Sequence, residues 1–408
     1  MSDNTTVKAV GSLRLKKGAD RRLRSGHLWI YSNEVDVATT PLKTLSAGSE
    51  VVVEDATDKF VAMAVVNPAS LICARLYSRE KNSYLGQSLI VNRLKQALQF
   101  RESYFSKPFY RAIFGDSDLL PGLVVDRFGD YLSAQLTTAA IDQRRDDVIA
   151  ALDEVFSPKG IVFRNQGPFR QMEGLPESVE VAAGDVPELV ELEENNTRFL
   201  APVMTGQKTG WFYDHRINRQ QLQKLAKDKT VLDVYSYVGG WGVQAATAGA
   251  KSVTCVDVSG DALDMVQQNA ELNSYGGQHG GQFSCLQGKA NDIMKSLADA
   301  GQTFDVVVLD PPAFIKRKKD QRQGEKAYHQ ANQLALRLLA PGGTLISASC
   351  SMHLPQQTLM DVIKTAAAHR HRQLQVFSIG GQGPDHPIHP AIPETNYLKS
   401  IFARDIQS

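Results

Sequence analysis

The sequence predicts an α/β protein. Its second half should form a seven-stranded, mostly parallel sheet, preceded by a small β-rich module and an α+β region. From about residue 200, strand patterns alternate with helical ones, which is typical of a parallel sheet. No long helix separates the last two strand patterns, so they should form an antiparallel hairpin. Before residue 80, short strand patterns alternate with polar turns instead.

The first two regions, which we expect to end near residues 80 and 198, combine strands with two helices. Polar turn residues and period-two runs mark the strands, and apolar spacing marks the helices. In order, we expect two strands within 48–67 around a turn at Asp55–Asp58, a strand at 71–78, a helix at 85–105, two strands within 114–136, a helix at 141–156 and a strand at 160–164.

The third region, 199–408, should carry the sheet. Its expected strands are short apolar runs, at 230–237, 251–259, 282–288, 304–310, 343–350, 374–380 and 398–404. Helical spacing fills the gaps, most clearly at 261–273 and 327–340.

The composition is that of an ordinary globular protein. The chain has 408 residues, of which 42% are hydrophobic and 22% charged, enough for two or three domains. We expect no signal peptide, no membrane span and a cytoplasmic location. The four cysteines, at 73, 255, 285 and 350, form no C-x-x-C pair, so we expect neither a metal site nor a disulfide framework.

Charge is unevenly distributed, although the net charge is only +1. Residues 14–24 hold six basic residues and one acid, and residues 316–326 hold six basic residues and two acids. Each run alone is more simply a solvated face. Together they favour an anionic partner such as RNA, with Arg21, Arg22, Arg317 and Lys318 as candidate contacts.

The run VVVLDPPAF, from Val306 to Phe314, poses a chemical question. It is a strand, apolar on both faces, that ends on a carboxylate and two prolines. Pro311 and Pro312 fix the backbone and remove two N–H donors, which leaves a stiff edge of acceptors. With Asp310 and the aromatic Phe314, this edge suits a nucleobase that carries exocyclic donors, although Asp-Pro is also ordinary turn chemistry.

A second group of residues fits a nucleoside cofactor. Gly239, Gly240 and Gly242 open a helix after the first strand of the sheet, so backbone N–H groups can face a ligand. Asp257 ends the next strand, where a carboxylate can accept both hydroxyls of a ribose. The pattern G-x-G-x-x-G is absent, and tyrosines 235 and 237 stand where a dinucleotide fold wants small residues.

The order of these features narrows the cofactor. A glycine loop, a ribose acid, a polar strand end at Asn291 and Asp292 that could meet an adenine edge, and then Asp-Pro-Pro is the order of a class I S-adenosylmethionine methyltransferase. A nicotinamide enzyme would have no use for the Asp-Pro-Pro loop.

Several longer motifs carry a family resemblance over nearly the whole chain. They are GHLWIYSNEV, GDSDLLPGLVVDRFGD, QKTGWFYDHR (207–216), YSYVGGWG, VDVS, DPPAF and SASCS. With them the chain resembles the ribosomal RNA large-subunit methyltransferase I family of cytosine-C5 RNA methyltransferases. The resemblance implies a PUA-like RNA-binding fold for residues 1–80, a Rossmann-like catalytic domain, S-adenosylmethionine as cofactor and a homodimer.

The chemistry at the base separates two alternatives. An exocyclic amine needs no covalent catalyst, whereas C5 of cytosine becomes a nucleophile only after a thiolate adds at C6. Cys350 ends the strand beside Asp-Pro-Pro among hydroxyls, so we expect it to be that nucleophile, with Asp310 on the N3/N4 edge of the base. A small buried hydrophobe is the ordinary reading of a free cysteine, and it fits Cys73, Cys255 and Cys285.

The expected site therefore combines a catalytic, a cofactor and a substrate set. The cofactor set is Asp233, Tyr235, Tyr237, Gly239, Gly240, Asp257, Val258, Asn291, Asp292 and Asp310, joined by resemblance with Gln207, Lys208, Tyr213, Asp214 and Arg216. The substrate set is Pro311, Pro312, Phe314 and the basic residues named above. An amine RNA methyltransferase and a non-catalytic RNA-binding assembly factor stay open as alternatives.

Overall fold

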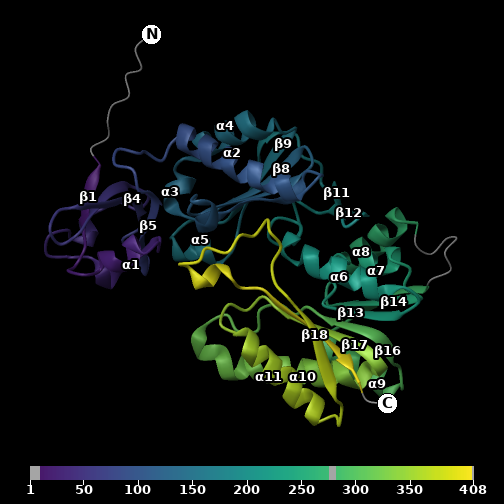
Figure 1. The fold of residues 1–408 in the computed structure, drawn as a ribbon. Helices are drawn as coiled ribbons and strands as arrows, with labels where there is room; N and C mark the ends of the chain where they lie inside the picture. Colours follow the sequence, from purple (N-terminus) through teal and green to yellow (C-terminus); the bar gives the residue numbers. More distant parts are fainter. Residues whose placement is uncertain (1–9, 275–281, 407–408) are drawn as a thin grey trace. The chain divides into compact units, whose positions relative to one another are not determined.

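The computed structural model describes residues 10–274 and 282–406. The chain divides into two compact units (Figure 1). The first, here called the N-terminal unit, is Met1–Val190 with Pro202–Trp211 and Pro384–Thr395. The second, here called the C-terminal unit, is Glu191–Ala201, Phe212–Gly383 and Asn396–Ser408. The division expected at residues 80 and 198 stays a prediction.

The N-terminal unit begins with a five-stranded sheet in the order β1-β3-β4-β5-β2. Alternate apolar residues of these strands pack into one core with Leu23 of the short helix α1 and Ile392. The elements are β1 (Gly11–Arg14), α1 (Asp20–Arg24), β2 (Trp29–Tyr31), η1 (Ser32–Glu34), η2 (Leu42–Thr44), β3 (Glu50–Glu54), β4 (Phe60–Val66) and β5 (Ile72–Ser78). The strands expected around the turn at 55–58 and at 71–78 are β3, β4 and β5.

A second five-stranded sheet follows in the same unit, in the order β10-β9-β8-β7-β6. Helices α2 and α4 contribute buried apolar residues to its core, including Leu94 and Leu152. The elements are α2 (Gln87–Tyr104), β6 (Phe109–Phe114), η3 (Gly115–Asp118), β7 (Leu123–Phe128), β8 (Tyr131–Leu136), α3 (Ala139–Asp142), α4 (Arg145–Phe156), β9 (Gly160–Asn165), α5 (Pro168–Met172) and β10 (Ser178–Gly184). The single helix expected at 141–156 is two helices, α3 and α4.

The C-terminal unit contains the seven-stranded sheet, in the order β15-β14-β13-β16-β17-β19-β18. Its strands are β13 (Thr230–Val234), β14 (Ser252–Asp257), β15 (Gln282–Gln287), β16 (Phe304–Leu309), β17 (Leu339–Ser349), β18 (Leu374–Gly380) and β19 (Lys399–Asp405). The pairs from β15 to β17 are parallel, and β19 pairs antiparallel with both β17 and β18. This confirms the predicted fold class.

Helices cover both faces of this sheet (Figure 1). Apolar residues of α9, α10 and α11 pack with those of β13, β16 and β17 in one core. The remaining elements of the unit are β11 (Val190–Glu194), β12 (Thr197–Ala201), η4 (Tyr213–His215), α6 (Arg216–Ala226), α7 (Gly242–Thr247), α8 (Gly260–Leu272), α9 (Ala290–Asp299), η5 (Lys318–Asp320), α10 (Gln321–Leu338) and α11 (Gln356–Ala368). The short helix η6 (Pro393–Thr395) belongs to the N-terminal unit.

The first strand of the sheet is shorter than expected. The apolar and aromatic run predicted a strand to residue 237, but β13 ends at Val234. Tyr235 and Tyr237 have φ angles of 68° and 48°. These angles lie in the left-handed region, which residues other than glycine rarely adopt and which cannot continue a strand. Strained backbone of this kind collects at functional sites.

Within residues 10–274 and 282–406, no helix combines the length and the apolar character that crossing a bilayer requires.

Candidate active site

Four chemically important segments end at the same edge of the seven-stranded sheet. Strands β14, β13, β16 and β17 are consecutive neighbours and run parallel. Their carboxyl ends therefore lie together, and this is the edge where open α/β sheets bind ligands. Asp257 is the last residue of β14, and Tyr235, Asp310 and Cys350 directly follow the ends of β13, β16 and β17.

Asp233 holds the glycine loop from below. Its Oδ2 accepts a hydrogen bond from the backbone N–H of Gly242 at 2.8 Å, while its Oδ1 is buried and has no hydrogen-bond partner among the described residues. Burial raises the pKa of Asp233 to about 7, and the bond from Gly242 opposes this rise. A Cβ on Gly242 would collide with Sγ of Cys255, so only glycine lets the loop pack this close. Gly239, with φ of 87°, makes the turn.

Asp257 stands at the end of β14 and organises the same loop. Its Oδ2 accepts the N–H of Tyr237 at 2.9 Å, and its Oδ1 accepts the N–H of Ser259 at 3.0 Å. The carboxylate is only partly buried and keeps unused lone pairs, because two oxygens offer about four acceptor sites. The next residue, Val258, is 67% exposed and offers an apolar surface at this edge.

A third polar position follows β15, at the start of α9. Oδ1 of Asn291 is buried without a hydrogen-bond partner in the described structure, whereas Asp292 is exposed. A ribose acceptor, an exposed apolar side chain and two buried, unpaired acceptor oxygens, on Asp233 and Asn291, fit a nucleoside cofactor with an amino group.

Asp310 connects the loop after β16 to the glycine loop and to η4. Its Oδ2 accepts the indole N–H of Trp241 at 2.9 Å, and its Oδ1 lies 3.2 Å from Nε2 of His215. Burial alone would raise the pKa of Asp310, but the contacts with His215 and Trp241 outweigh burial and lower it. Asp310 is therefore an ionised acceptor.

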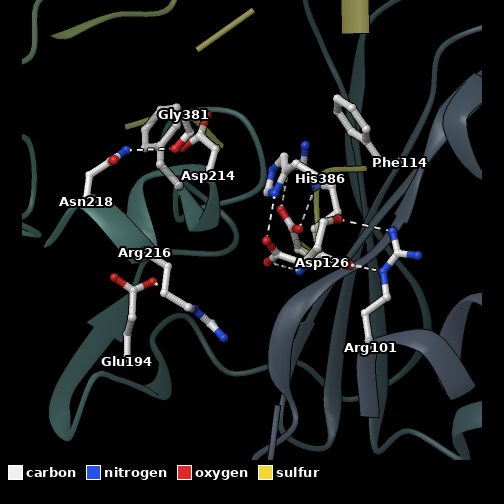
Figure 2. A network of polar contacts seen from close by, with 12 residues as sticks. Arg101, Phe114, Asp126, Glu194, Asp214, Arg216, Asn218, Gly381 and His386 are labelled. Carbon is white, nitrogen blue, oxygen red and sulfur yellow. Dashed lines mark hydrogen bonds and ion pairs between the residues drawn. The ribbon is translucent and has the colours of Figure 1, made fainter. Parts of the chain in front are cut away.

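The tautomer of His215 follows from its other neighbour. Nδ2 of Asn218 lies 3.1 Å from Nδ1 of His215 and also donates to the carbonyl of Gly381 at 2.9 Å (Figure 2). Because an amide nitrogen only donates, Nδ1 of a neutral His215 accepts and Nε2 carries the proton toward Asp310. His215 lies inside QKTGWFYDHR but was missing from the expected site residues.

The residues expected from QKTGWFYDHR divide between the units. Gln207 and Lys208 belong to the N-terminal unit, and their role at the cofactor stays a prediction. In the C-terminal unit, Tyr213, Asp214 and Arg216 are all buried. Oδ2 of Asp214 accepts a hydrogen bond from the hydroxyl of Tyr397 at 2.6 Å. Nε of Arg216 lies 3.6 Å from Oε2 of Glu194 (Figure 2). The guanidinium group of Arg216 also lies over the ring of Tyr213. These contacts join η4 to other side chains of the protein. Contacts of the three residues with the cofactor stay predictions.

At the end of β17, Ser349 and Ser351 flank Cys350 in the sequence. Both of their hydroxyls contact the phenol of Tyr328 on α10, at 2.8 and 2.9 Å. Oγ of Ser351 also accepts the backbone N–H of Ile315 at 3.3 Å. The hydroxyls therefore anchor the cysteine turn to α10 and to the Asp-Pro-Pro-Ala-Phe loop.

Of the three cysteines that we expect to be buried, two are buried and one is partly exposed. Cys73 and Cys255 are buried, while Cys285 and Cys350 are partly exposed. Burial raises the pKa of Cys73 to about 12 and also raises the pKa of Cys255 well above its usual range, so both thiols are protonated and inert at neutral pH. Cys350 differs from Cys285 in its place, because only Cys350 follows a strand at the carboxyl edge.

The loop after Asp310 carries the expected substrate residues. Pro311 is buried and Pro312 is exposed. The ring of Phe314 lies 4.8 Å from that of Tyr328 and 6.3 Å from that of Tyr235, so its position is fixed by two aromatic neighbours.

The basic residues that follow the loop are exposed, and one of them is already paired. Residues 316–319 all lie at the surface. Arg317 is paired with Asp320 through Nε at 2.9 Å, whereas Lys318 has no ion-pair partner within the described ranges.

The basic run of the N-terminal unit is less available than its sequence implies. Arg22 donates to both oxygens of Glu34, at 2.8 and 2.6 Å, and to the carbonyl of Trp29, so its charge is largely used inside the fold. Arg24 is paired with Asp20 and Asp55. Arg21 is exposed and forms no ion pair in the part of the chain described here.

Comparisons with known proteins agree with this geometry. Residues 13–79 match a PUA-like domain model, and residues 169–378 match a model of S-adenosylmethionine-dependent methyltransferases. Ribosomal RNA large subunit methyltransferase I of Cronobacter sakazakii is 34% identical over 95% of this chain and 98% of its own length. The protein of the same name from Aeromonas hydrophila is 35% identical, over 96% and 99%.

Solved structures show the same fold. A candidate S-adenosylmethionine-dependent methyltransferase from Streptococcus mutans has a TM-score of 0.80 and 21% identity, and covers 96% of this chain and 100% of that one. A candidate methyltransferase solved with S-adenosylhomocysteine has a TM-score of 0.82 and 21% identity, and covers 97% and 100%. The fold is shown by these structures, and the relatives that are 34% and 35% identical over nearly the whole of both chains show that the chain belongs to the ribosomal RNA large subunit methyltransferase I family of S-adenosylmethionine-dependent methyltransferases.

Proposed function

We propose that this protein transfers a methyl group from S-adenosylmethionine to C5 of a cytosine in large-subunit ribosomal RNA, through a covalent bond between Cys350 and the base. The relatives named above carry the RNA class in their names. The observation that carries the carbon chemistry is the place of Cys350. It is partly exposed at the end of β17, directly beside β16, whose end holds the ionised carboxylate of Asp310.

The proposed residues would divide the cofactor between them. S-adenosylmethionine supplies the methyl group as an electrophile when it is bound. Asp257 would accept the ribose hydroxyls, Val258 would cover the adenine ring, and Asn291 or Asp292 would meet the adenine edge. The glycine loop held by Asp233 would present its backbone to the rest of the molecule.

The proposed reaction is a balanced addition and elimination. The thiolate of Cys350 forms a bond to C6 of the cytosine, and the electron pair of the C5–C6 double bond moves onto C5. C5 would then bond to the methyl carbon while the methyl–sulfur bond of the cofactor breaks and S-adenosylhomocysteine leaves. A general base would take the C5 proton, the electron pair of the C5–H bond would restore the C5–C6 double bond, and the sulfur–C6 bond would break to release Cys350 as a thiolate. Asp310, being ionised, would accept a hydrogen bond from the N4 amino group and hold the base against the thiol. A proton for N3 must come from another group.

The RNA would be held by the exposed basic residues and the PUA-like region. The target base must leave its stack to reach the edge of the sheet, and Phe314 offers a fixed aromatic face beside it. Lys318 and Arg317 follow that face and could meet flanking phosphates, as could Arg21 in the N-terminal unit. We further propose a three-domain division at residues 80 and 198, a homodimer and a cytoplasmic location.

The test is a trap for the covalent intermediate. RNA with 5-fluorocytidine at the target has no C5 proton to lose, so the methylated adduct should stay attached and survive denaturing electrophoresis. Cys350→Ala should abolish both adduct and turnover. Cys285→Ala, which changes an equally half-buried thiol on β15, is the matched control and should keep both.

The alternatives predict other results. An exocyclic-amine methyltransferase would form no adduct, would tolerate Cys350→Ala and would yield an N-methylated base in nucleoside chromatography. An assembly factor without catalysis would bind RNA and transfer no methyl group. Either result would overturn the cytosine-C5 proposal.

A further inference from the structure

Lys399 is a buried cation with an unusual set of partners. It is the first residue of β19 and is only 6% exposed. Its Nζ donates to the carbonyls of Ser351, at 2.6 Å, and Tyr397, at 2.7 Å. It forms no ion pair with an aspartate or glutamate of the described residues. Two neutral carbonyls compensate a buried charge only in part, so a lysine at such a position calls for a function.

The lysine lies against the turn that carries Cys350. In the antiparallel pairing of β17 and β19, Ser349 lies opposite Lys399. The side chain of Lys399 then reaches the carbonyl of Ser351. Cys350 is thus enclosed between two residues that both contact the lysine. An ammonium group has three donors, and the two carbonyls use two of them.

The electrostatics agree with this geometry. Burial lowers the pKa of Lys399 to about 8, and the charge on Cys350 opposes the lowering, so thiol and ammonium interact. With that pKa the lysine is still mostly protonated at neutral pH. Burial raises the pKa of Tyr328, on α10, and the charge on Cys350 also raises it, so this phenol stays neutral. Burial raises the pKa of Asp310, on the loop after β16, but its contacts with His215 and Trp241 lower it.

We propose that the buried ammonium group of Lys399 stabilises Cys350 as a thiolate, and that Lys399 is therefore a positioning residue for methyl transfer. This inference rests on the proposed role of Cys350 as nucleophile. The lysine touches neither base nor cofactor in this scheme. It acts through the sulfur, because a nearby cation favours the thiolate and the thiolate is the form that attacks.

The test reads the thiol directly and needs no RNA. The full-length protein is alkylated with iodoacetamide across a range of pH, and the rate at each cysteine is followed by peptide mass spectrometry. In Lys399→Met the inflection of the Cys350 profile should move up by about one pH unit, which is roughly a tenfold slower reaction at pH 7. Lys399→Arg keeps the charge and should restore most of the rate. Cys285, on the distant edge strand β15, is the reference within the same sample.

The direction of the effect separates an electrostatic from a structural role. If Lys399 only tied the turn down through its two carbonyl bonds, its loss would loosen the turn and speed the alkylation of Cys350. Thermal denaturation and binding of S-adenosylhomocysteine check that Lys399→Met is folded. In a folded variant, an unchanged or faster Cys350 reaction would overturn the inference.

Failure of the inference and failure of the proposed function give different results. If Cys350→Ala abolishes adduct and turnover while Lys399→Met leaves the Cys350 profile unmoved, the nucleophile stands and the role of the lysine falls. If the profile moves but Cys350→Ala still methylates RNA fully, the electrostatic pair stands, and its assignment to the reaction falls with the cytosine-C5 proposal.

Discussion

Replacing Asp257 with alanine should weaken the binding of S-adenosylmethionine more than any other single change at the cofactor edge. The carboxylate is expected to accept hydrogen bonds from the ribose, and it also accepts the backbone N–H groups of Tyr237 and Ser259. The substitution therefore removes a ligand contact and frees the loop in which Tyr237 holds its left-handed conformation.

The magnitude follows from the kind of bonds that are lost. A hydrogen bond to a charged group contributes about 1.5–3 kcal/mol, so losing the ribose contact alone should weaken binding about 10- to 150-fold. The two backbone donors that lose their acceptor lie near solvent, so water can replace the carboxylate and their loss should add less. Asp257→Asn keeps one acceptor oxygen and should fall between the wild type and the alanine variant.

Titration calorimetry with S-adenosylhomocysteine measures this difference. Asp261→Ala is the matched control, because it removes an equal charge from an exposed position in the first turn of α8. The control should bind like the wild type. A folded Asp257→Ala protein with unchanged affinity would show that the ribose does not meet β14, and the cofactor site would then have to be placed elsewhere.

Three further changes test other parts of the site. Lys318→Glu should weaken RNA binding and flatten the slope of log K against log salt, with cofactor affinity unchanged; an unaltered slope would mean that this basic run is only a solvated face. Trp241→Phe removes a hydrogen-bond donor to Asp310 and should therefore raise the pKa of this carboxyl. Because the ionised carboxylate is the active form, the acid limb of the pH–rate profile should move to higher pH. An unmoved acid limb would show that the ionisation of Asp310 does not control the rate. Gly242→Ala should lower the free energy of unfolding, measured by urea denaturation, by about 1–3 kcal/mol, because its methyl group would collide with the sulfur of Cys255. Adding Cys255→Ala should restore part of the lost stability. If the destabilisation of the double variant equals the sum of the two single effects, the proposed collision is refuted.

The catalytic sheet could be predicted well because its signals are local and repeated. Each buried parallel strand is a short apolar run, and each run ends on the residue that later stands at the carboxyl edge. Asp257 and Cys350 could therefore be placed from the sequence alone. The placement of these residues does not require the order of the strands, which follows from the usual connections of such sheets.

The partners of those residues could not be predicted, because they come from distant parts of the chain. Nothing local in YSYVGGWG says that the indole of Trp241 binds Asp310, which lies 69 positions later. His215 was overlooked within a motif whose other polar residues were named. The hydroxyls of Ser349 and Ser351 are neighbours of Cys350 in the sequence, but the sequence does not show that the end of β17 turns them toward Tyr328.

The segment boundaries failed for a similar reason. Tyr235 and Tyr237 belong by composition to a strand, and aromatic residues are enriched in strands. Their backbone nevertheless makes hydrogen bonds that the sequence does not show: the N–H of Tyr237 donates to Asp257, and the N–H of Tyr235 donates to the carbonyl of Val256.

The bond from Ile315 to the hydroxyl of Ser351 has a consequence for how a substrate could be chosen. Together with Tyr328 it joins the loop that would face the base to the turn that bears the thiol, so the two cannot move independently of the α10 core. A site fastened in this way cannot adjust itself to a poorly placed base. All the adaptation must then occur in the RNA, and sequences that unstack at low cost would react first. Discrimination between targets would in that case depend on the mechanics of the nucleic acid more than on the number of contacts made with it.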